Sequence, residues 1–219
     1  CAAGLEMFKY QLNKKGMVSF PSDIEGIEGN SFSIQEGIDM FHRESDYNKD
    51  SVDNFRKDLP WIADVDGIFN QNNQWDSNVY RDSFLNTYFS FVVGSVFDSY
   101  HHHEPYSVFM SEKIYKPLTN FHPFLYMSNS GTLEVLKELG FKTFHPFIDE
   151  SYDKEPDNLK RFNMIMSELK RLCSMKISEL HNLYWQLSDI LIHNQNTYYE
   201  KAFPLSEQRI EDVLNIVME

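Results

Sequence analysis

The amino-acid sequence predicts an α/β fold: a largely parallel, doubly wound sheet that is closed off by C-terminal helices. Two observations lead to this fold class. Apolar runs typical of buried strands alternate with segments of helical periodicity through the second half of the chain. Alternation of this kind favours a parallel sheet with helices on its faces. Hydrophobic residues make up 42% of the 219 residues and aromatic residues 15%, so a substantial core is available.

The first half of the chain is the less regular part. Its elements are expected to be a helix over Ala2–Leu12, a strand over Met17–Phe20, an acidic loop over Pro21–Asn30 and a helical segment from Ser31 to Lys57. Lys14-Lys15-Gly16 gives the first helix a basic, glycine-terminated end. We interpret residues 1–80 as an N-terminal α/β segment with acidic loops, a remnant of a second domain or a link to one.

Residues 81–219 form the main predicted domain. Ser111 is a natural N-cap, and Gly140 suits the position after a helix end. The expected elements, in order, are a strand within Phe84–Phe97, a helix from Ser111 to Asn120, a strand over His122–Met127, a tight turn over Ser128–Gly131, a helix over Thr132–Leu139, a strand over Lys142–Ile148, and helices over Asp157–Cys173, Ile177–Asn194 and Ser206–Met218.

The charge and the cysteine content restrict which partners and which cellular compartment we expect. The net charge of −13, from 33 acidic and 20 basic residues, repels a phosphate backbone, so we expect no nucleic-acid partner. No apolar run approaches ~18 residues, so we expect no transmembrane segment. Cys1 and Cys173 cannot form a disulfide framework, which fits a reducing, cytoplasmic location. Because the chain begins at Cys1, we expect it to be one domain of a longer polypeptide.

The segment most informative about function begins at Ser111-Glu112-Lys113. The expected order of elements places helix N-termini at strand ends, where open α/β sheets bind phosphorylated ligands. A carboxylate such as Glu112 can hold sugar hydroxyls, while the neighbouring ammonium of Lys113 holds a phosphate. The alternative is an ordinary helix start, in which Ser111 caps the helix and Glu112 favours its macrodipole.

The stretch FMSEKIYKPLTNFHPFLYMSNSGTLEVL resembles the donor-binding segment of GT-B glycosyltransferases, particularly the fucosyltransferase-like group. The continuation GFKTFHPFIDESYD is similar to uncharacterised glycosyltransferase-like proteins of bacteria and viruses. The resemblance implies a Rossmann-like GT-B half in which Glu112 holds the donor ribose and Lys113 the diphosphate. It also implies a second donor-side turn at Ser128, Asn129, Ser130 and Gly131.

By the same resemblance, the implied reaction is inverting transfer of a hexosyl or fucosyl group from a nucleotide-diphosphate sugar to a glycan hydroxyl, with neither metal nor cofactor. A GDP-sugar is the first guess for the donor. The acceptor hydroxyl also needs a base. Asp149 and Glu150 are candidates because they follow a predicted strand, and the alternative, which such loops favour, is a solvated turn that caps the next helix. In the resembling family the base usually comes from the other domain.

Two other functions stay open on the sequence alone. One is a glycosyltransferase-like module that binds its ligand without turnover, as a scaffold within a larger protein. The other is a metal-dependent GT-A enzyme, because Asp64-Val65-Asp66 is a D-x-D tripeptide whose two carboxylates share one side of an extended segment.

Overall fold

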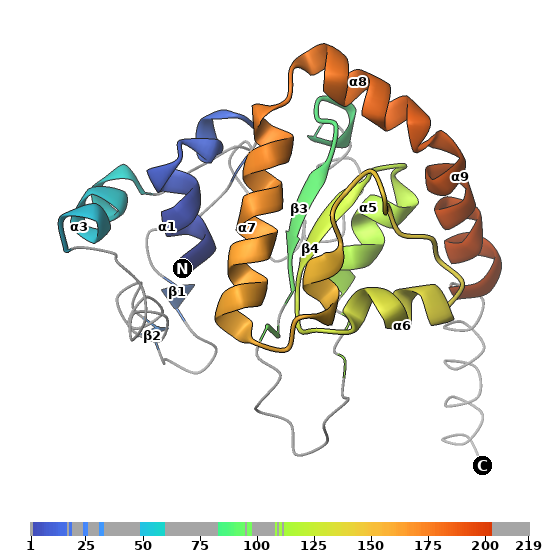
Figure 1. Ribbon diagram of the computed structural model, residues 1–219, viewed down its shortest axis with the longest axis horizontal. Coiled ribbons are helices and arrows are strands. Elements are labelled where there is room, and N and C mark those ends of the chain that lie inside the picture. Colours follow the sequence, from blue (N-terminus) through green and yellow to red (C-terminus); the bar gives the residue numbers. More distant parts are fainter. Residues whose placement is uncertain are drawn as a thin grey trace, which may run out of the picture. The chain divides into compact units, whose positions relative to one another are not determined.

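A computed structural model describes residues 2–16, 18, 24–25, 31–32, 49–59, 83–94, 96–97, 108, 110 and 112–202. The chain falls into two compact units, Cys1–Ser83 and Phe84–Glu219, which we describe separately. The described residues form a mixed α/β structure that is mostly helical (Figure 1). Their sheets are one antiparallel and one parallel strand pair, so they do not show a doubly wound sheet.

Unit 1 is built on two packed helices, α1 (Ala2–Lys9) and α3 (Lys49–Asp58). The Phe8 and Phe55 rings meet across this contact with their centroids 5.8 Å apart. A 3-10 turn, η1 (Leu12–Lys14), follows α1, and β1 (Ile24–Glu25) pairs antiparallel with β2 (Ser31–Phe32).

Unit 2 contains the parallel strand pair. β3 (Ser90–Val93) and β4 (Phe124–Met127) run side by side, with Ser90 opposite Phe124 and Val93 opposite Met127. All four residues of β4 are buried, as expected for a parallel strand covered on both faces. Both strands fall within the apolar runs from which they were predicted.

Helices surround this strand pair, and Figure 1 shows the strands between α7 on one side and α5 on the other. α7 is the longest described helix, and Asp157 caps it by accepting a hydrogen bond from the Lys160 amide at 2.8 Å. The helical elements of unit 2 are η3 (Glu112–Ile114), α5 (Tyr115–Thr119), α6 (Thr132–Glu138), η4 (Ser151–Lys154), α7 (Asn158–Ser174), α8 (Ile177–Gln186), α9 (Ser188–Thr197) and the π-helical turn η5 (Tyr198–Ala202).

The prediction of a strand over Lys142–Ile148 is wrong. This segment is an extended stretch followed by a turn in which the amides of Phe147 and Ile148 both donate to the Phe144 carbonyl. Pro146 has no amide hydrogen to offer a ladder. Side chains take over the role of a neighbouring strand, because Phe144 donates its amide hydrogen to Glu150.

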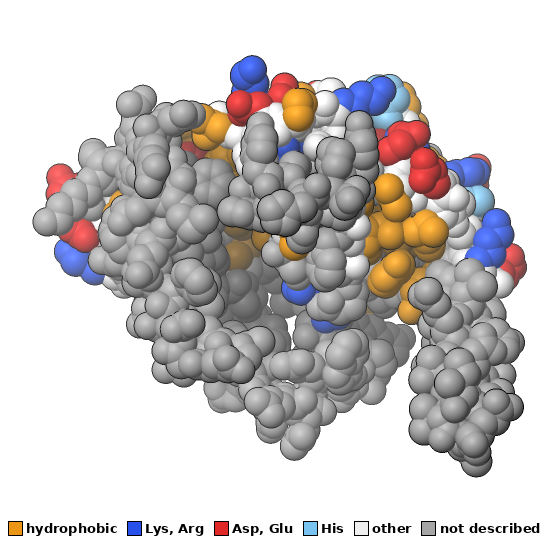
Figure 2. Space-filling view, turned by 90° about the horizontal axis from the view of Figure 1, so that it is seen from below, with side chains coloured by type: hydrophobic (Ala, Val, Ile, Leu, Met, Phe, Trp, Pro, Cys, Tyr) orange, Lys and Arg blue, Asp and Glu red, His pale blue; other side chains and the backbone are white. Residues whose placement is uncertain are grey.

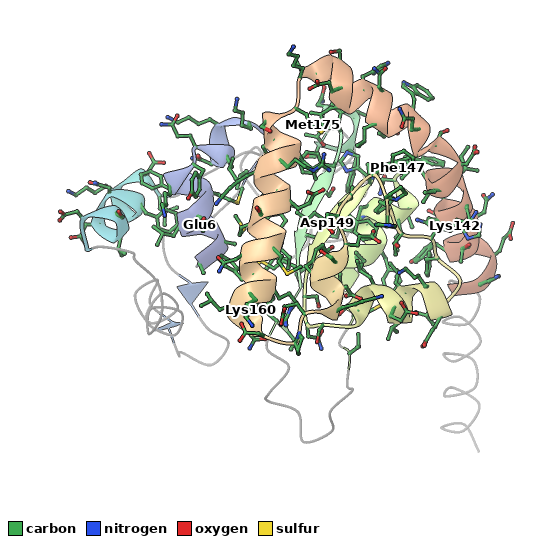
Figure 3. All side chains as sticks on the ribbon, viewed as in Figure 1. Glu6, Lys142, Phe147, Asp149, Lys160 and Met175 are labelled. Atoms are coloured by element: carbon green, nitrogen blue, oxygen red, sulfur yellow. The ribbon has the colours of Figure 1, made fainter. Side chains whose placement is uncertain are left out.

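Asn194 on α9 holds the start of the same segment. Its Oδ1 accepts the Lys142 amide at 2.7 Å, and its Nδ2 donates to the Lys142 carbonyl at 2.8 Å. The Asn194 side chain is 1% exposed and thus pairs with the backbone as an adjacent strand would. Figure 3 shows Lys142 beside α9 and Asp149 beside α7, so the segment spans the space between these helices.

Two further predictions need correction. Ser31–Lys57 is not one helical segment, because Ser31 and Phe32 pair with β1 and the described helix begins at Lys49. Ile177–Asn194 is two helices that meet at Leu187, a fully buried residue whose amide donates to both Leu183 and Tyr184 in a tightened turn. The expected Met17–Phe20 strand (apart from Val18) and the Ser206–Met218 helix lie outside the described residues.

Gly140, after the end of α6, lies close to the end of α9 and to η5. A Cβ on Gly140 would lie 3.4 Å from Lys201 Nζ and 3.7 Å from Thr197 Cγ2, and Leu139 and Tyr199 are both exposed. Figure 2 shows hydrophobic side chains gathered on the side of the molecule near the end of α9.

Within the described ranges, every helix is too short or too polar to cross a bilayer.

His122 lies just before β4 and is 2% exposed. Its Nε2 donates to the Thr87 carbonyl at 2.9 Å. Its Nδ1 lies 2.7 Å from the Ser90 hydroxyl, which donates to it when the imidazole is neutral. Burial lowers the pKa of His122, and the hydrogen bond to Thr87 opposes part of that shift.

We predict that Asn194→Ala lowers the free energy of unfolding by about 1–3 kcal/mol, because it removes both partners of the Lys142 backbone. Asn196→Ala is the matched control, since Asn196 lies exposed on the same helix. It should change stability by less than ~0.5 kcal/mol. Urea unfolding measures both, and equal midpoints for the two variants would contradict the role of Asn194.

We also predict that His122 makes the protein more sensitive to acid. Because its pKa is lower in the folded chain, its contribution is fully present above about pH 6.5, the unfolded value, and is lost as pH falls through the folded pKa. Urea unfolding of the wild type and His122→Gln at about pH 8 and about pH 5 tests this. The wild type should lose more stability on acidification, and parallel losses would refute the prediction.

Candidate functional site

The candidate site is the carboxyl edge of the strand pair, where Gly94 follows β3 and Ser128 follows β4. The two strands end level, because the Gly94 amide donates to the Met127 carbonyl at 2.8 Å. η3 contacts β3. Val108, just upstream of η3, lies 3.9 Å from the position that a Cβ on Gly131 would take. The structure thus brings Val108, which precedes the Glu112–Lys113 segment, close to the Ser128–Gly131 turn.

The residues of the predicted donor motif are described to different extents. Ser111 lies outside the described residues, and for Glu112 the backbone alone is described, as the first residue of η3. Lys113 is exposed on η3.

The Ser128–Gly131 turn directs many of its polar groups inward. Ser128 and Asn129 are 3% and 5% exposed. The Thr132 hydroxyl donates to the Asn129 carbonyl at 2.7 Å, and the Ser128 hydroxyl lies within hydrogen-bond distance of Val96 O and Asn129 Oδ1. Gly131 has φ +82°, a left-handed conformation that favours glycine. The turn therefore connects β4 to α6 through a network of internal hydrogen bonds.

Asp153 occupies the N-terminus of α6. Its Oδ1 accepts the Leu133 amide at 3.0 Å, its Oδ2 accepts the Glu134 amide at 3.3 Å, and its carbonyl accepts the Gly131 amide at 2.8 Å. Burial raises the pKa of Asp153, and the two amide hydrogen bonds oppose that shift. A carboxylate of the chain itself thus takes the place that a bound phosphate would need at this helix end.

The two candidate bases, Asp149 and Glu150, both make structural contacts. Glu150 accepts the Thr143 hydroxyl at 2.7 Å and the Phe144 amide at 2.6 Å, so both of its oxygens are engaged. Asp149 is exposed and accepts the Ser151 amide at 2.9 Å. Hydrogen bonds from Ser151 lower the pKa of Asp149, which makes its carboxylate a weaker base.

Arg161 is a buried cation at this edge that the sequence reasoning missed. It is 1% exposed and reaches from α7 to the residues that follow both strands: its Nε donates to Ser128 O at 3.1 Å and its Nη2 to Phe97 O. The guanidinium also lies 4.5 Å from the centroid of the Phe97 ring. Because Arg is a common surface residue of helices, its position in the sequence carried no signal of burial.

The remaining contacts of Arg161 complete its hydrogen bonding. Nη1 donates to Glu155 O at 2.8 Å and to Pro156 O at 3.3 Å, and Nη2 donates to Asn158 Oδ1 at 2.6 Å. A guanidinium has five N–H donors, and these five acceptors use all of them. Arg161 therefore joins the strand ends, the loop before α7 and α7 itself, and has no donor left for a ligand phosphate.

No group of three or more His, Cys, Asp or Glu side chains in the described part of the chain could hold a metal ion. Asp64 and Asp66 lie outside the described residues, so the D-x-D hypothesis stays a prediction.

Comparison of the chain with models of protein families, with curated proteins and with solved structures finds no match. The resemblance to GT-B glycosyltransferases therefore rests on the residues of the Glu112–Lys113 segment and its continuation.

We predict that Arg161→Met lowers the free energy of unfolding by more than about 3 kcal/mol, because several buried carbonyl groups lose their donor. Arg161→Lys should be intermediate, since an ammonium keeps the charge but has three donors. Lys160→Met is the matched control on an exposed neighbour and should stay within about 0.5 kcal/mol of the wild type. Denaturant unfolding measures whether stability falls in the order Lys160→Met, Arg161→Lys, Arg161→Met. An Arg161→Met variant as stable as Lys160→Met would contradict the prediction.

Proposed function

We propose that this chain is a GT-B-type glycosyltransferase whose unit 2 binds the nucleotide-sugar donor at the carboxyl edge of β3 and β4. The observation that supports the proposal is that the chain just before the Glu112–Lys113 segment approaches the turn after β4. η3 packs on β3, while Val108 approaches Gly131 in the turn after β4. In open α/β sheets, ligands bind outside the carboxyl ends of parallel strands.

The described contacts favour one division of roles among the candidate residues. Asp153 occupies the start of α6 and Arg161 uses its donors within the fold, so neither position is assigned to the diphosphate. By the resemblance, Lys113 holds the diphosphate. An ammonium at this position stabilises the negative charge that develops on the leaving diphosphate. Glu112, by the resemblance, holds the ribose hydroxyls.

The proposed reaction transfers a sugar from a nucleotide diphosphate to an acceptor hydroxyl, without a metal and with inversion. A GDP-sugar is the first donor to test, and a glycan is the expected acceptor. Asp149 and Glu150 are weak choices for the base, because one has a lowered pKa and the other has both oxygens engaged. The proposal therefore takes the base from a segment outside unit 2 or from another domain.

We predict that one nucleotide among GDP, UDP, CDP and ADP raises the melting temperature of the chain, and that EDTA leaves the shift unchanged. At a ligand concentration ~100 times Kd the stabilisation is about 2.7 kcal/mol. Lys113→Ala should abolish most of the shift. Lys176→Ala, which removes an exposed lysine at the start of α8, is the control and should retain it.

The outcomes of this screen separate the functions. Binding that EDTA abolishes would favour the metal-dependent alternative with Asp64 and Asp66. Binding without release of the sugar, when an acceptor is supplied, would favour a non-catalytic module. Failure of every nucleotide to bind would refute the donor site proposed for this chain.

A further inference from the structure

One side chain at the carboxyl edge is left without a hydrogen-bond partner. Tyr126 lies in β4 and is 1% exposed, yet its hydroxyl finds no partner among the residues that the structure describes. Buried hydroxyl groups in native proteins are nearly always hydrogen-bonded, and an exception calls for a physical explanation. A buried hydroxyl without a partner lowers the stability of the fold by its desolvation penalty. A ligand that hydrogen-bonds it would explain its presence.

The position of this hydroxyl is defined by Gly94, the residue that follows β3. A Cβ built on Gly94 would lie 3.1 Å from Tyr126 Oη, 3.1 Å from Ser128 Oγ and 3.3 Å from Met127 O. All three nearest atoms are oxygens. Gly94 is half-buried, and because it has no side chain, no Cβ stands against these three oxygens at the end of the sheet.

The surroundings of these three oxygens favour an uncharged ligand group. Tyr115 on α5 is half-buried, and its ring lies 5.5 Å from that of Tyr198. Burial raises the pKa of the Tyr115 phenol, with smaller contributions from Tyr198 and Tyr126, so this phenol stays neutral at physiological pH. Hydroxyl and carbonyl oxygens suit a hydroxyl group, which can both donate and accept, better than they suit a phosphate, which only accepts.

We infer that the Tyr126 hydroxyl hydrogen-bonds a hydroxyl group of the nucleotide sugar, and that Gly94 permits this close approach. The inference rests on the proposed function, because it places the sugar or ribose part of that same donor. It adds a specificity-determining contact that lies on the strand itself, apart from Glu112 and Lys113. Binding then supplies the partner that the unliganded protein lacks.

The test separates ligand binding from folding. Calorimetric titration with GDP-fucose, GDP and 2′-deoxy-GDP, or with the matching set for whichever base the wild type binds, is made on the wild type and Tyr126→Phe. The variant should bind GDP-fucose about tenfold more weakly, as expected for one lost hydrogen bond. Without ligand it should unfold at the same urea concentration as the wild type or at a higher one, because it loses an unpaired polar group.

Tyr152→Phe is the matched control. Tyr152 is also a buried tyrosine beside β4, but its hydroxyl accepts the Tyr126 amide at 3.4 Å and so has a structural partner. This variant should keep the wild-type affinity and gain no stability. Gly94→Ala is a second test, because its methyl group would crowd the three oxygens and should weaken binding as well.

Each result has a distinct consequence. Equal affinities of Tyr126→Phe and the wild type would overturn the inference while leaving the proposed function intact. A Tyr126→Phe variant that is less stable without ligand would also overturn it, because the hydroxyl would then have a partner within the protein. Loss of affinity for GDP-fucose alone identifies the transferred sugar as the contact, and loss for GDP but not 2′-deoxy-GDP identifies the ribose. A wild type that binds no nucleotide would refute both proposals.

Discussion

The described part of unit 2 depends most on the hydrogen bonds of one buried cation, Arg161. Its guanidinium donates to the carbonyl groups that follow both strands, at Phe97 and Ser128, and to the loop before its own helix. With a single pair of described parallel strands, the backbone groups beyond the strand ends have no further ladder to join. A side chain with five donors in a fixed plane can satisfy several of them at once, and it fixes the strand ends relative to α7.

The same solution recurs around the sheet. Asp153 supplies acceptors for the first amides of α6, Glu150 for the segment after Phe141, and Asn194 both a donor and an acceptor for Lys142. Each side chain replaces a hydrogen bond that a strand or a longer helix would have provided. Because buried backbone groups must be paired, these few polar residues determine where the irregular segments can run.

These side-chain-to-backbone hydrogen bonds also distinguish residues with a structural role from candidates for function at the carboxyl edge. Arg161, Asp153 and Glu150 carry charges that a sequence motif would assign to a ligand, but each is committed to the backbone of this chain. The Tyr126 hydroxyl, in contrast, is buried near Gly94 without a described partner. The inference about Tyr126 follows from this comparison of donors and acceptors.

The sequence by itself determined the elements whose signals are local. The strand pair, the Ser128–Gly131 turn and the Asp157-capped helix α7 all lie where apolar runs, turn residues and caps predicted them. Tertiary structure decided the rest. The apolar pattern of Lys142–Ile148 predicts a strand. In the structure, however, its backbone hydrogen-bonds the side chains of Glu150, which follows it closely, and of Asn194, which lies far along the chain. Likewise, the burial of Arg161 and the capping of α6 by Asp153 depend on hydrogen bonds between residues about 20 to 60 positions apart, which local periodicity does not encode.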